Sequence, residues 1–140
     1  MPDFTFATYA DLPGLDPDDR LAVVELERRG ASVAAAVWND PSVDWSCAGT
    51  VVIRSTWDYH LHYHAFLAWL DRVAEVAAIW NPAPLVRRNA VKTYMQDLET
   101  RGVPVVPTAW VEAGRQCDLS RLMRDRGWEK YLVGAGGISA

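Results

Sequence analysis

Short apolar runs alternate with longer amphipathic segments along the first part of the chain. The amphipathic segments, residues 17–29 and 63–76, repeat apolar positions at spacings of three and four, which predicts helices that each bury one face. The apolar runs predict short strands at residues 4–9, 32–38, 50–55 and 77–80. Because strand and helix alternate through short links, the pattern predicts an α/β fold with a right-handed, doubly wound parallel sheet.

The first helix has clear signals at both ends. Asp16 is a good N-cap, and Gly30 is a typical helix stop. Two acidic residues of the first turn, Asp18 and Asp19, suit the positive end of the helix dipole. The buried face of this helix is predicted to consist of the apolar residues Leu21, Val24 and Leu26.

The pattern changes near residue 84, which predicts two domains, residues 1–84 and 85–140. The second begins with a charged helix and a strand-like run, continues with a helix that Asp118 caps and Gly127 ends, and finishes with a strand. The helix, the run and the strand are predicted at residues 85–101, 104–111 and 131–133.

The third predicted strand stops abruptly on polar and aromatic residues. Open parallel sheets bind ligands at the carboxyl ends of their strands, so this cluster is the main candidate for a binding site. The alternative is structural: Trp57 and Tyr59 cover a hydrophobic edge, and Arg54 pairs with Asp58. The candidate binding residues are Arg54, Thr56, Trp57 and Asp58.

Composition narrows the functional classes. Of the 140 residues, 50% are hydrophobic and 23% are charged, and the net charge is −4, which argues against a nucleic-acid partner. No apolar run is long enough to span a bilayer, and the N-terminus lacks the basic region of a signal peptide. Cys47 and Cys117 lie far apart, which indicates free thiols and a cytoplasmic location.

Two further groups of residues could bind ligands. His60, His62 and His64 alternate at the start of a helix, where such spacing does not converge on a metal, so we expect solvated histidines. Lys92 could meet a phosphate, together with backbone amides of the C-terminal glycines. The alternatives are a solvated lysine and a frayed terminus. The glycines are Gly134, Gly136 and Gly137.

Four segments together resemble the N-terminal part of a bacterial ATP-grasp protein of the glutathione-synthetase-like or RimK-like sort. Two are particular to a subgroup: Leu-Pro-Gly-Leu-Asp-Pro-Asp-Asp-Arg at residues 12–20 and Arg-Ser-Thr-Trp-Asp-Tyr at residues 54–59. Two are more general: Asn81-Pro82 leading to an Asn89-x-x-Lys92 helix, and a Gly-x-Pro-x-x-Pro-Thr strand entry at residues 102–108.

The resemblance implies a Rossmann-like pre-ATP-grasp domain with a parallel sheet, followed by the start of an ATP-grasp α+β subdomain. Such ligases use ATP and Mg²⁺ to convert a small-molecule carboxylate to an acyl phosphate, which an amine or similar nucleophile then attacks. By resemblance, Lys92 contacts a phosphate oxygen. Arg54, Trp57 and Asp58 face the substrate, and the arginine could grip its carboxylate with a bidentate fork.

Two departures from the family pattern limit these expectations. The usual Lys-Pro before the phosphate loop is absent, because Val133 runs directly into Gly134. Family members are also considerably longer, so we expect an incomplete chain that is inactive alone. A non-catalytic Rossmann-like binding module, or a remnant that works through a partner, is the alternative. The oligomeric state stays open, with a homodimer among the alternatives.

Overall fold

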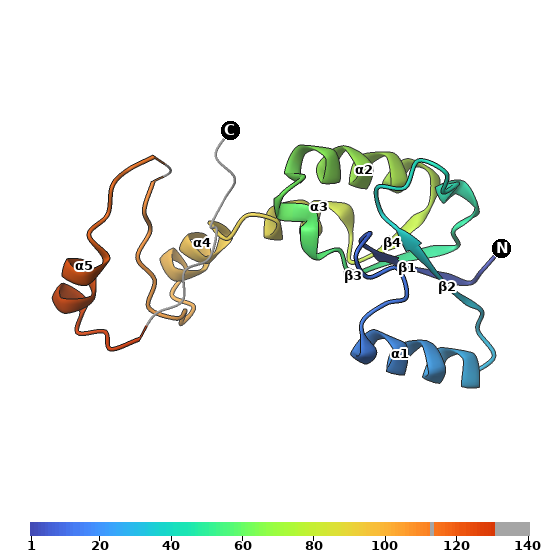
Figure 1. The fold of residues 1–140 in the computed structure, drawn as a ribbon, viewed down its shortest axis with the longest axis horizontal. Coiled ribbons are helices and arrows are strands. Elements are labelled where there is room, and N and C mark those ends of the chain that lie inside the picture. The colour runs from blue at the N-terminus through green and yellow to red at the C-terminus, as the bar shows by residue number, and fades with distance from the viewer. Residues whose placement is uncertain (113, 131–140) are drawn as a thin grey trace. The chain divides into compact units, whose positions relative to one another are not determined.

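The computed structural model describes residues 1–112 and 114–130 (Figure 1). The chain divides into two compact units, residues 1–88 and residues 89–140. The two domains predicted from the sequence, residues 1–84 and 85–140, stay a prediction. The first unit contains, in chain order, β1 (Phe4–Thr8), α1 (Pro17–Arg28), β2 (Val33–Val37), the short 3₁₀ helix η1 (Trp45–Cys47), β3 (Thr50–Ser55), the 3₁₀ helix η2 (Trp57–His60), α2 (Tyr63–Val76), β4 (Ala78–Trp80) and α3 (Ala83–Asn89).

The four strands form one parallel sheet in the order β2-β1-β3-β4. Helix α1, which follows β1, and helix α2, which follows β3, cover opposite faces of this sheet (Figure 1). The predicted α/β architecture with a parallel sheet is therefore confirmed. The chain leaves β1 toward β2 on one side and returns to β3 on the other, so the strand order reverses between β1 and β3.

The core lies between the sheet and α2. This helix buries Phe66, Trp69, Leu70 and Val73, which recur at spacings of three and four on one face. They pack with Ala7 and Val51 of the two central strands, together with Trp38 and Ala48. Burying one such large apolar side chain contributes about 1.5–3 kcal/mol, so this cluster dominates the stability of the first unit.

The buried face predicted for α1 is wrong at Leu21 and Val24. Leu21 and Val24 are 70% and 63% exposed, and the buried member of the helix is Asp19. Val23 and Leu26 are partly buried and lie four and seven residues after Asp19, so these three positions share one face of the helix. This face of the helix lies toward the sheet, where Arg54 and Ser55 of β3 donate to the Asp19 carboxylate.

The second unit contains α4 (Tyr94–Thr100) and α5 (Leu119–Arg126). The continuous helix predicted over residues 85–101 is wrong, because α3 ends at Asn89 and the chain turns before α4. Asn89, Val91 and Thr93 all have low helix propensity, which favours this interruption. Lys92 lies in the turn.

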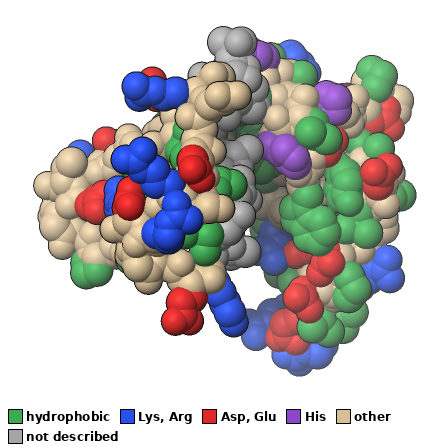
Figure 2. All heavy atoms as spheres, turned by 60° about the vertical axis from the view of Figure 1, so that its left-hand side comes forward, with side chains coloured by type: hydrophobic (Ala, Val, Ile, Leu, Met, Phe, Trp, Pro, Cys, Tyr) green, Lys and Arg blue, Asp and Glu red, His purple; other side chains and the backbone are tan. Residues whose placement is uncertain are grey.

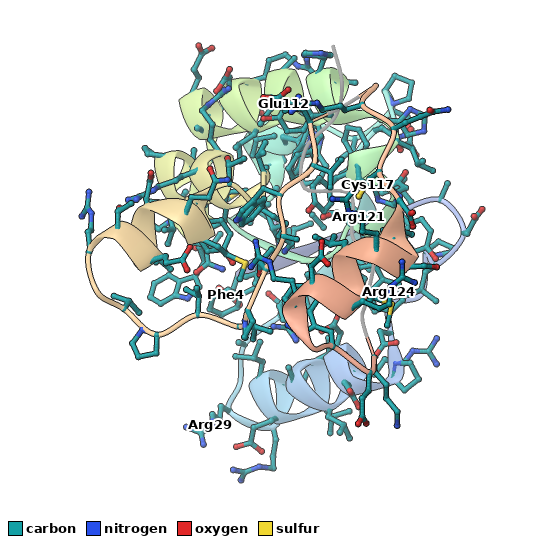
Figure 3. The ribbon with its side chains drawn as sticks, turned by 90° about the vertical axis from the view of Figure 1, so that its left-hand side faces the viewer. Phe4, Arg29, Glu112, Cys117, Arg121 and Arg124 are labelled. Atoms are coloured by element: carbon teal, nitrogen blue, oxygen red, sulfur yellow. The ribbon has the colours of Figure 1, made fainter. Side chains whose placement is uncertain are left out.

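The strand predicted at residues 104–111 is also wrong, since no strand forms there. Pro104 and Pro107 have no N–H to donate to a neighbouring strand, which weakens any pairing of this run. Helix α5 is confirmed: the Asp118 carboxylate accepts from the amide of Arg121, and Gly127 ends the helix at φ 65°. Arg121 and Arg124 project from this helix in Figure 3.

No helix among residues 1–112 and 114–130 is both long enough and apolar enough to span a membrane. The predicted strand at residues 131–133 and the predicted phosphate contacts Gly134, Gly136 and Gly137 lie outside the described residues.

Candidate functional site

The candidate site lies where β1 and β3 end side by side. In an open parallel sheet, helices that leave neighbouring strands toward opposite faces leave a crevice at the carboxyl ends of those strands, and ligands bind there. In this sheet that point lies between β1 and β3. Tyr9 follows β1, and Trp57 follows β3. Their rings lie 6.1 Å apart between centroids. The segments that follow β1 and β3 therefore each contribute one aromatic side chain to this point.

An ion pair joins β3 to the first turn of α1 at this point. The Arg54 Nε donates a hydrogen bond to one carboxylate oxygen of Asp19 at 2.7 Å, and a terminal nitrogen, Nη2, lies 2.7 Å from the same oxygen in an ion pair. The Ser55 hydroxyl donates to the other oxygen at 2.5 Å. The Asp19 side chain is only 6% exposed, whereas that of Arg54 is 48% exposed. The carboxylate is therefore buried and fully engaged, and the guanidinium reaches solvent.

A β-bulge lets two consecutive side chains reach one carboxylate. The register of β1 against β3 pairs Ala7 with Ile53 and Thr8 with Ser55, so Arg54 is the extra residue. In a regular strand, successive side chains point to opposite faces of the sheet. A bulge changes the direction of a side chain, and bulges often lie beside active sites. The irregularity therefore explains why Arg54 and Ser55 both contact Asp19.

The loop from β1 to α1 places Asp19. The Thr8 hydroxyl donates to the carbonyl of Leu12 at 2.8 Å, and the Asp16 carboxylate caps the helix by accepting from the amide of Asp18 at 2.9 Å. Leu15 is buried and has φ 66°, an unusual conformation for a residue with a branched side chain. These features set the helix start, which fixes where the carboxylate of Asp19 meets β3.

The other predicted substrate residues differ in exposure. Trp57 is 53% exposed and Thr56 is 4% exposed. The Asp58 carboxylate accepts a hydrogen bond from the indole nitrogen of Trp38, at 2.8 Å. Trp38 follows β2, so the end of that strand also contributes to the site. Trp57 is thus partly exposed to solvent. The hydrogen bond of Asp58 joins the segment after β3 to the end of β2.

The structural alternative predicted for this cluster is wrong in one of its parts. Arg54 pairs with Asp19 instead of Asp58. Trp57 is half exposed, and its ring meets that of Tyr9. Tyr59 does pack against the hydrophobic core, as the alternative predicted. Sequence reasoning missed Asp19, which it assigned only to the helix dipole. The available signal was its position in the subgroup-specific segment at residues 12–20.

Of the residues predicted to contact phosphate, only Lys92 is among the described residues. Lys92 is exposed and belongs to the second unit, and the three glycines lie outside the described residues. The histidines are solvated, as predicted: His60, His62 and His64 are exposed, and histidine side chains are visible at the surface in Figure 2. In the part of the chain that the structure describes, no three His, Cys, Asp or Glu residues gather in a way that could hold a metal ion.

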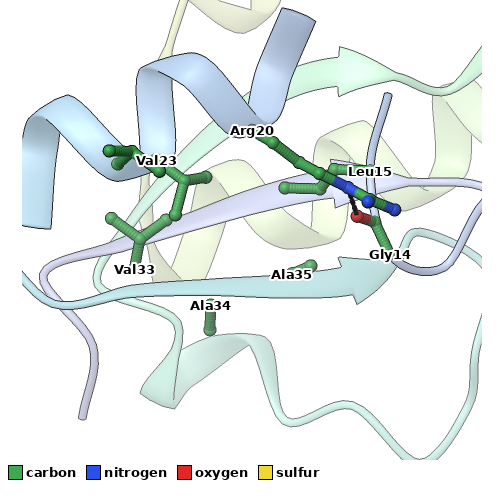
Figure 4. Close-up of a pocket in the computed structure, with 8 residues that line it drawn as sticks. Gly14, Leu15, Arg20, Val23, Val33, Ala34 and Ala35 are labelled. Atoms are coloured by element: carbon green, nitrogen blue, oxygen red, sulfur yellow. Dashed lines mark hydrogen bonds between the residues drawn. The ribbon is translucent and has the colours of Figure 1, made fainter. Parts of the chain in front are cut away.

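A groove of about 350 Å³ lies between α1 and β2, away from the predicted substrate residues (Figure 4). Its lining is mostly apolar and includes Val23, Val33 and Ala35. At one end, the Nε of Arg20 donates to the carbonyl of Gly14 at 2.8 Å, which closes the loop before α1. None of the predicted substrate residues lines the groove, so it is separate from the candidate site.

Comparison with known proteins places the first unit in a family. Residues 4–81 match the family described as "D-cycloserine synthetase DcsG, N-terminal domain". The cycloserine biosynthesis protein DcsG of Streptomyces lavendulae is 41% identical over 85 residues, which cover 61% of this chain and 28% of that protein. The crystal structure of D-cycloserine synthetase DcsG superposes with a TM-score of 0.73 at 32% identity, over 89% of this chain and 42% of that one. The chain thus spans less than half the length of these relatives.

Proposed function

The chain belongs to the family of the N-terminal domain of D-cycloserine synthetase DcsG, and from this premise we propose that it supplies the substrate-binding part of an ATP-dependent, carboxylate-activating ligase of the ATP-grasp type. The curated match and the matching crystal structure both carry the name DcsG and a description from cycloserine synthesis, which supports a biosynthetic ligase as the reaction class. The sequence resemblance supports the ATP-grasp assignment, and the two distant cysteines, Cys47 and Cys117, support a cytoplasmic location.

The half-exposed guanidinium of Arg54 carries this proposal. It lies at the end of β3, where the strand order reverses, three residues before the half-exposed Trp57. A planar guanidinium binds carboxylates with well-defined geometry, and its charge is permanent. We therefore assign Arg54 to binding and orienting the carboxylate of a small-molecule substrate, and Trp57 to covering the rest of that molecule.

In such a ligase the γ-phosphoryl group of ATP passes to the substrate carboxylate, and an amine or similar nucleophile then displaces phosphate from the acyl phosphate. Arg54 holds one end of the carboxylate and limits its rotation, which favours a productive geometry. Lys92 is proposed to contact a phosphate oxygen, together with Gly134, Gly136 and Gly137. No Mg²⁺ ligand is assigned to this chain, since its described residues offer no metal-binding cluster.

A chimera tests the proposal. Residues 4–81 replace the matching segment of DcsG from Streptomyces lavendulae, and ATP-dependent formation of D-cycloserine is measured with and without Arg54→Ala. We expect the chimera to be active. We expect Arg54→Ala to lower kcat/KM by roughly 10–100-fold, because a charged hydrogen bond contributes about 1.5–3 kcal/mol.

Arg29→Ala is the matched control. Arg29 is an exposed arginine at the end of α1, where it pairs with Glu25 (Figure 3), so its loss removes the same charge far from the site. The control should keep the turnover of the parent chimera. A chimera with Arg54→Ala that retains full kcat/KM would contradict the assignment of the substrate carboxylate to Arg54.

A further inference from the structure

The carboxylate of Asp19 holds Arg54 from one side only. Both contacts of the guanidinium, from Nε and from Nη2, go to a single oxygen of Asp19. A guanidinium has five N–H donors in a rigid plane. Its Nε–Nη2 edge therefore faces Asp19. Nη1 has no hydrogen-bond partner among the described residues, so the end of the guanidinium formed by Nη1 and the outer N–H of Nη2 stays available. With 48% of the side chain exposed, that free end can reach solvent.

Asp19 is itself fixed. Ser55 occupies its second oxygen, and the side chain is almost completely buried. It lies one turn after the N-cap of α1, in a helix start that the loop from β1 defines. A buried, fully hydrogen-bonded carboxylate has one low-energy position, because any rotation would leave charge unpaired in a poorly solvated place. It can therefore restrain a longer and more mobile arginine.

The bulge adds a second restraint. Arg54 is the extra residue where the register between β1 and β3 shifts, so its backbone is displaced from the regular strand. Without this shift, Arg54 and the neighbouring Ser55 would project toward opposite faces of the sheet. Both instead meet one acceptor that comes from the helix. The shift therefore brings Ser55 to the face of Arg54, where its hydroxyl occupies the second oxygen of Asp19.

We propose that Asp19 is a positioning residue, which aims the Nη1–Nη2 end of Arg54 at the substrate carboxylate. This inference rests on the proposed function of Arg54 in carboxylate binding. It adds that the substrate carboxylate approaches the guanidinium end-on, because the side-on edge belongs to Asp19. A merely structural pair would only tie α1 to β3, and the orientation of the free end would not matter for binding.

The test uses the 140-residue chain, labelled with ¹⁵N, with acetate as the carboxylate probe. Chloride replaces acetate as needed to keep the ionic strength constant. The guanidinium signals of Arg54 and the indole N–H signal of Trp57 report binding. In the wild-type chain, we expect saturable acetate shifts at the Nη groups of Arg54, with little shift at Nε. For Asp19→Asn, we expect binding that is weaker by about tenfold, which corresponds to about 1.4 kcal/mol. Asp19→Glu, which keeps the charge but moves it by one methylene, should weaken binding similarly.

Val73→Ala is the control for stability. Val73 is a 1% exposed residue of α2 in the hydrophobic core, and Arg54 is not part of that core. This variant should therefore lower the Tm while acetate binding stays at the wild-type level. If Asp19→Asn does not fold, Asp19→Glu and the wild-type pattern of Nη and Nε shifts decide the question. Wild-type acetate affinity in a folded Asp19 variant, or shifts centred on Nε, would overturn the positioning role and leave the proposed function standing. Absence of any acetate shift at Arg54 in the wild-type chain would overturn both.

Discussion

The buried indole of Trp38 donates a hydrogen bond from its nitrogen to the carboxylate of Asp58, at 2.8 Å. The two residues follow the ends of β2 and β3, the strands on either side of β1. Trp38 also packs edge-on against Phe66 and Trp69 of α2. The hydrogen bond thus connects the hydrophobic core to the polar segment that carries the candidate site.

Replacing Trp38 by phenylalanine should measure how much this hydrogen bond contributes to the free energy of unfolding. Trp38→Phe keeps an aromatic ring in the core but leaves Asp58 without its donor. Trp69→Phe is the matched control, because Trp69 is equally buried and its indole nitrogen has no hydrogen-bond partner among the described residues. We expect Trp38→Phe to lower the free energy of unfolding by about 1–2 kcal/mol more than Trp69→Phe does. Urea denaturation followed by circular dichroism checks this, and equal losses would show that the hydrogen bond contributes nothing net.

Truncating Trp57 should separate a binding role from a packing role. The side chain is 53% exposed and its ring contact is with Tyr9, so Trp57→Ala should cost no more than about 1 kcal/mol. Trp69→Ala, in the core, should cost about 3–5 kcal/mol. In the chimera with DcsG, Trp57→Ala should nevertheless raise the KM for the carboxylate substrate. Unfolding curves and steady-state kinetics measure the two effects. An unchanged KM would show that Trp57 does not contribute to substrate binding.

The sequence predicted the sheet well because its strands and helices have local signals. The bounds of β3 and α2 follow from an apolar run and from a repeat at spacings of three and four. The helix caps Asp16 and Asp118 are equally local, because each bonds an amide within three residues. Such features need no knowledge of distant parts of the chain.

The site could be predicted only in part, because its central contact is not local. Asp19 and Arg54 lie 35 residues apart, and they meet only because α1 packs on the sheet and β3 bulges. A bulge has no distinct residue pattern in this strand, so the redirected side chain of Ser55 has no signal in the sequence. The same holds for α1, whose buried face was mistaken because a buried aspartate looks like a surface residue until its partner is known.

Acid should weaken the contact between the start of β1 and the start of β2. The Asp3 carboxylate accepts from the amide and hydroxyl of Ser32, at 2.7 and 2.6 Å, and these hydrogen bonds lower its pKa below the ordinary value of 3.8. A carboxyl with a depressed pKa in the folded state stabilises the protein above its unfolded pKa, and this contribution disappears as the pH falls through the folded pKa.

The stability advantage of the wild-type chain over Asp3→Asn should therefore shrink as the pH falls from about 5 to about 3. Thermal unfolding at a series of pH values measures this difference. Asp11→Asn is the control, because it removes one carboxylate from an exposed position in the loop after β1. Its difference from the wild-type chain should change less over the same range. A constant gap between wild type and Asp3→Asn would show that the Ser32 contacts do not favour the ionised form.

Gly49 is the glycine that the fold of the first unit most needs. It lies directly before β3 with φ 65°, and a Cβ atom placed on it would lie 2.2 Å from the carbonyl oxygen of Pro2 and 2.7 Å from that of Asp3. Both contacts are with backbone, and the Asp3 carbonyl also accepts the amide of Thr50 at 2.9 Å. The clash therefore cannot be relieved by turning a side chain, and it would force apart the starts of β1 and β3.

Gly30→Ala is the matched control for Gly49→Ala. Gly30 also has a positive φ, 87°, but an added Cβ would meet nothing within 4 Å. The control therefore measures the backbone strain alone, about 1–2 kcal/mol. Gly49→Ala adds the clash to a similar strain and should cost about 3 kcal/mol or more. Since this unit holds both the core and the ion pair of Asp19 with Arg54, its Tm and its acetate binding should fall together in Gly49→Ala. Equal losses of stability in the two alanine variants would contradict the close approach of the N-terminal segment to β3.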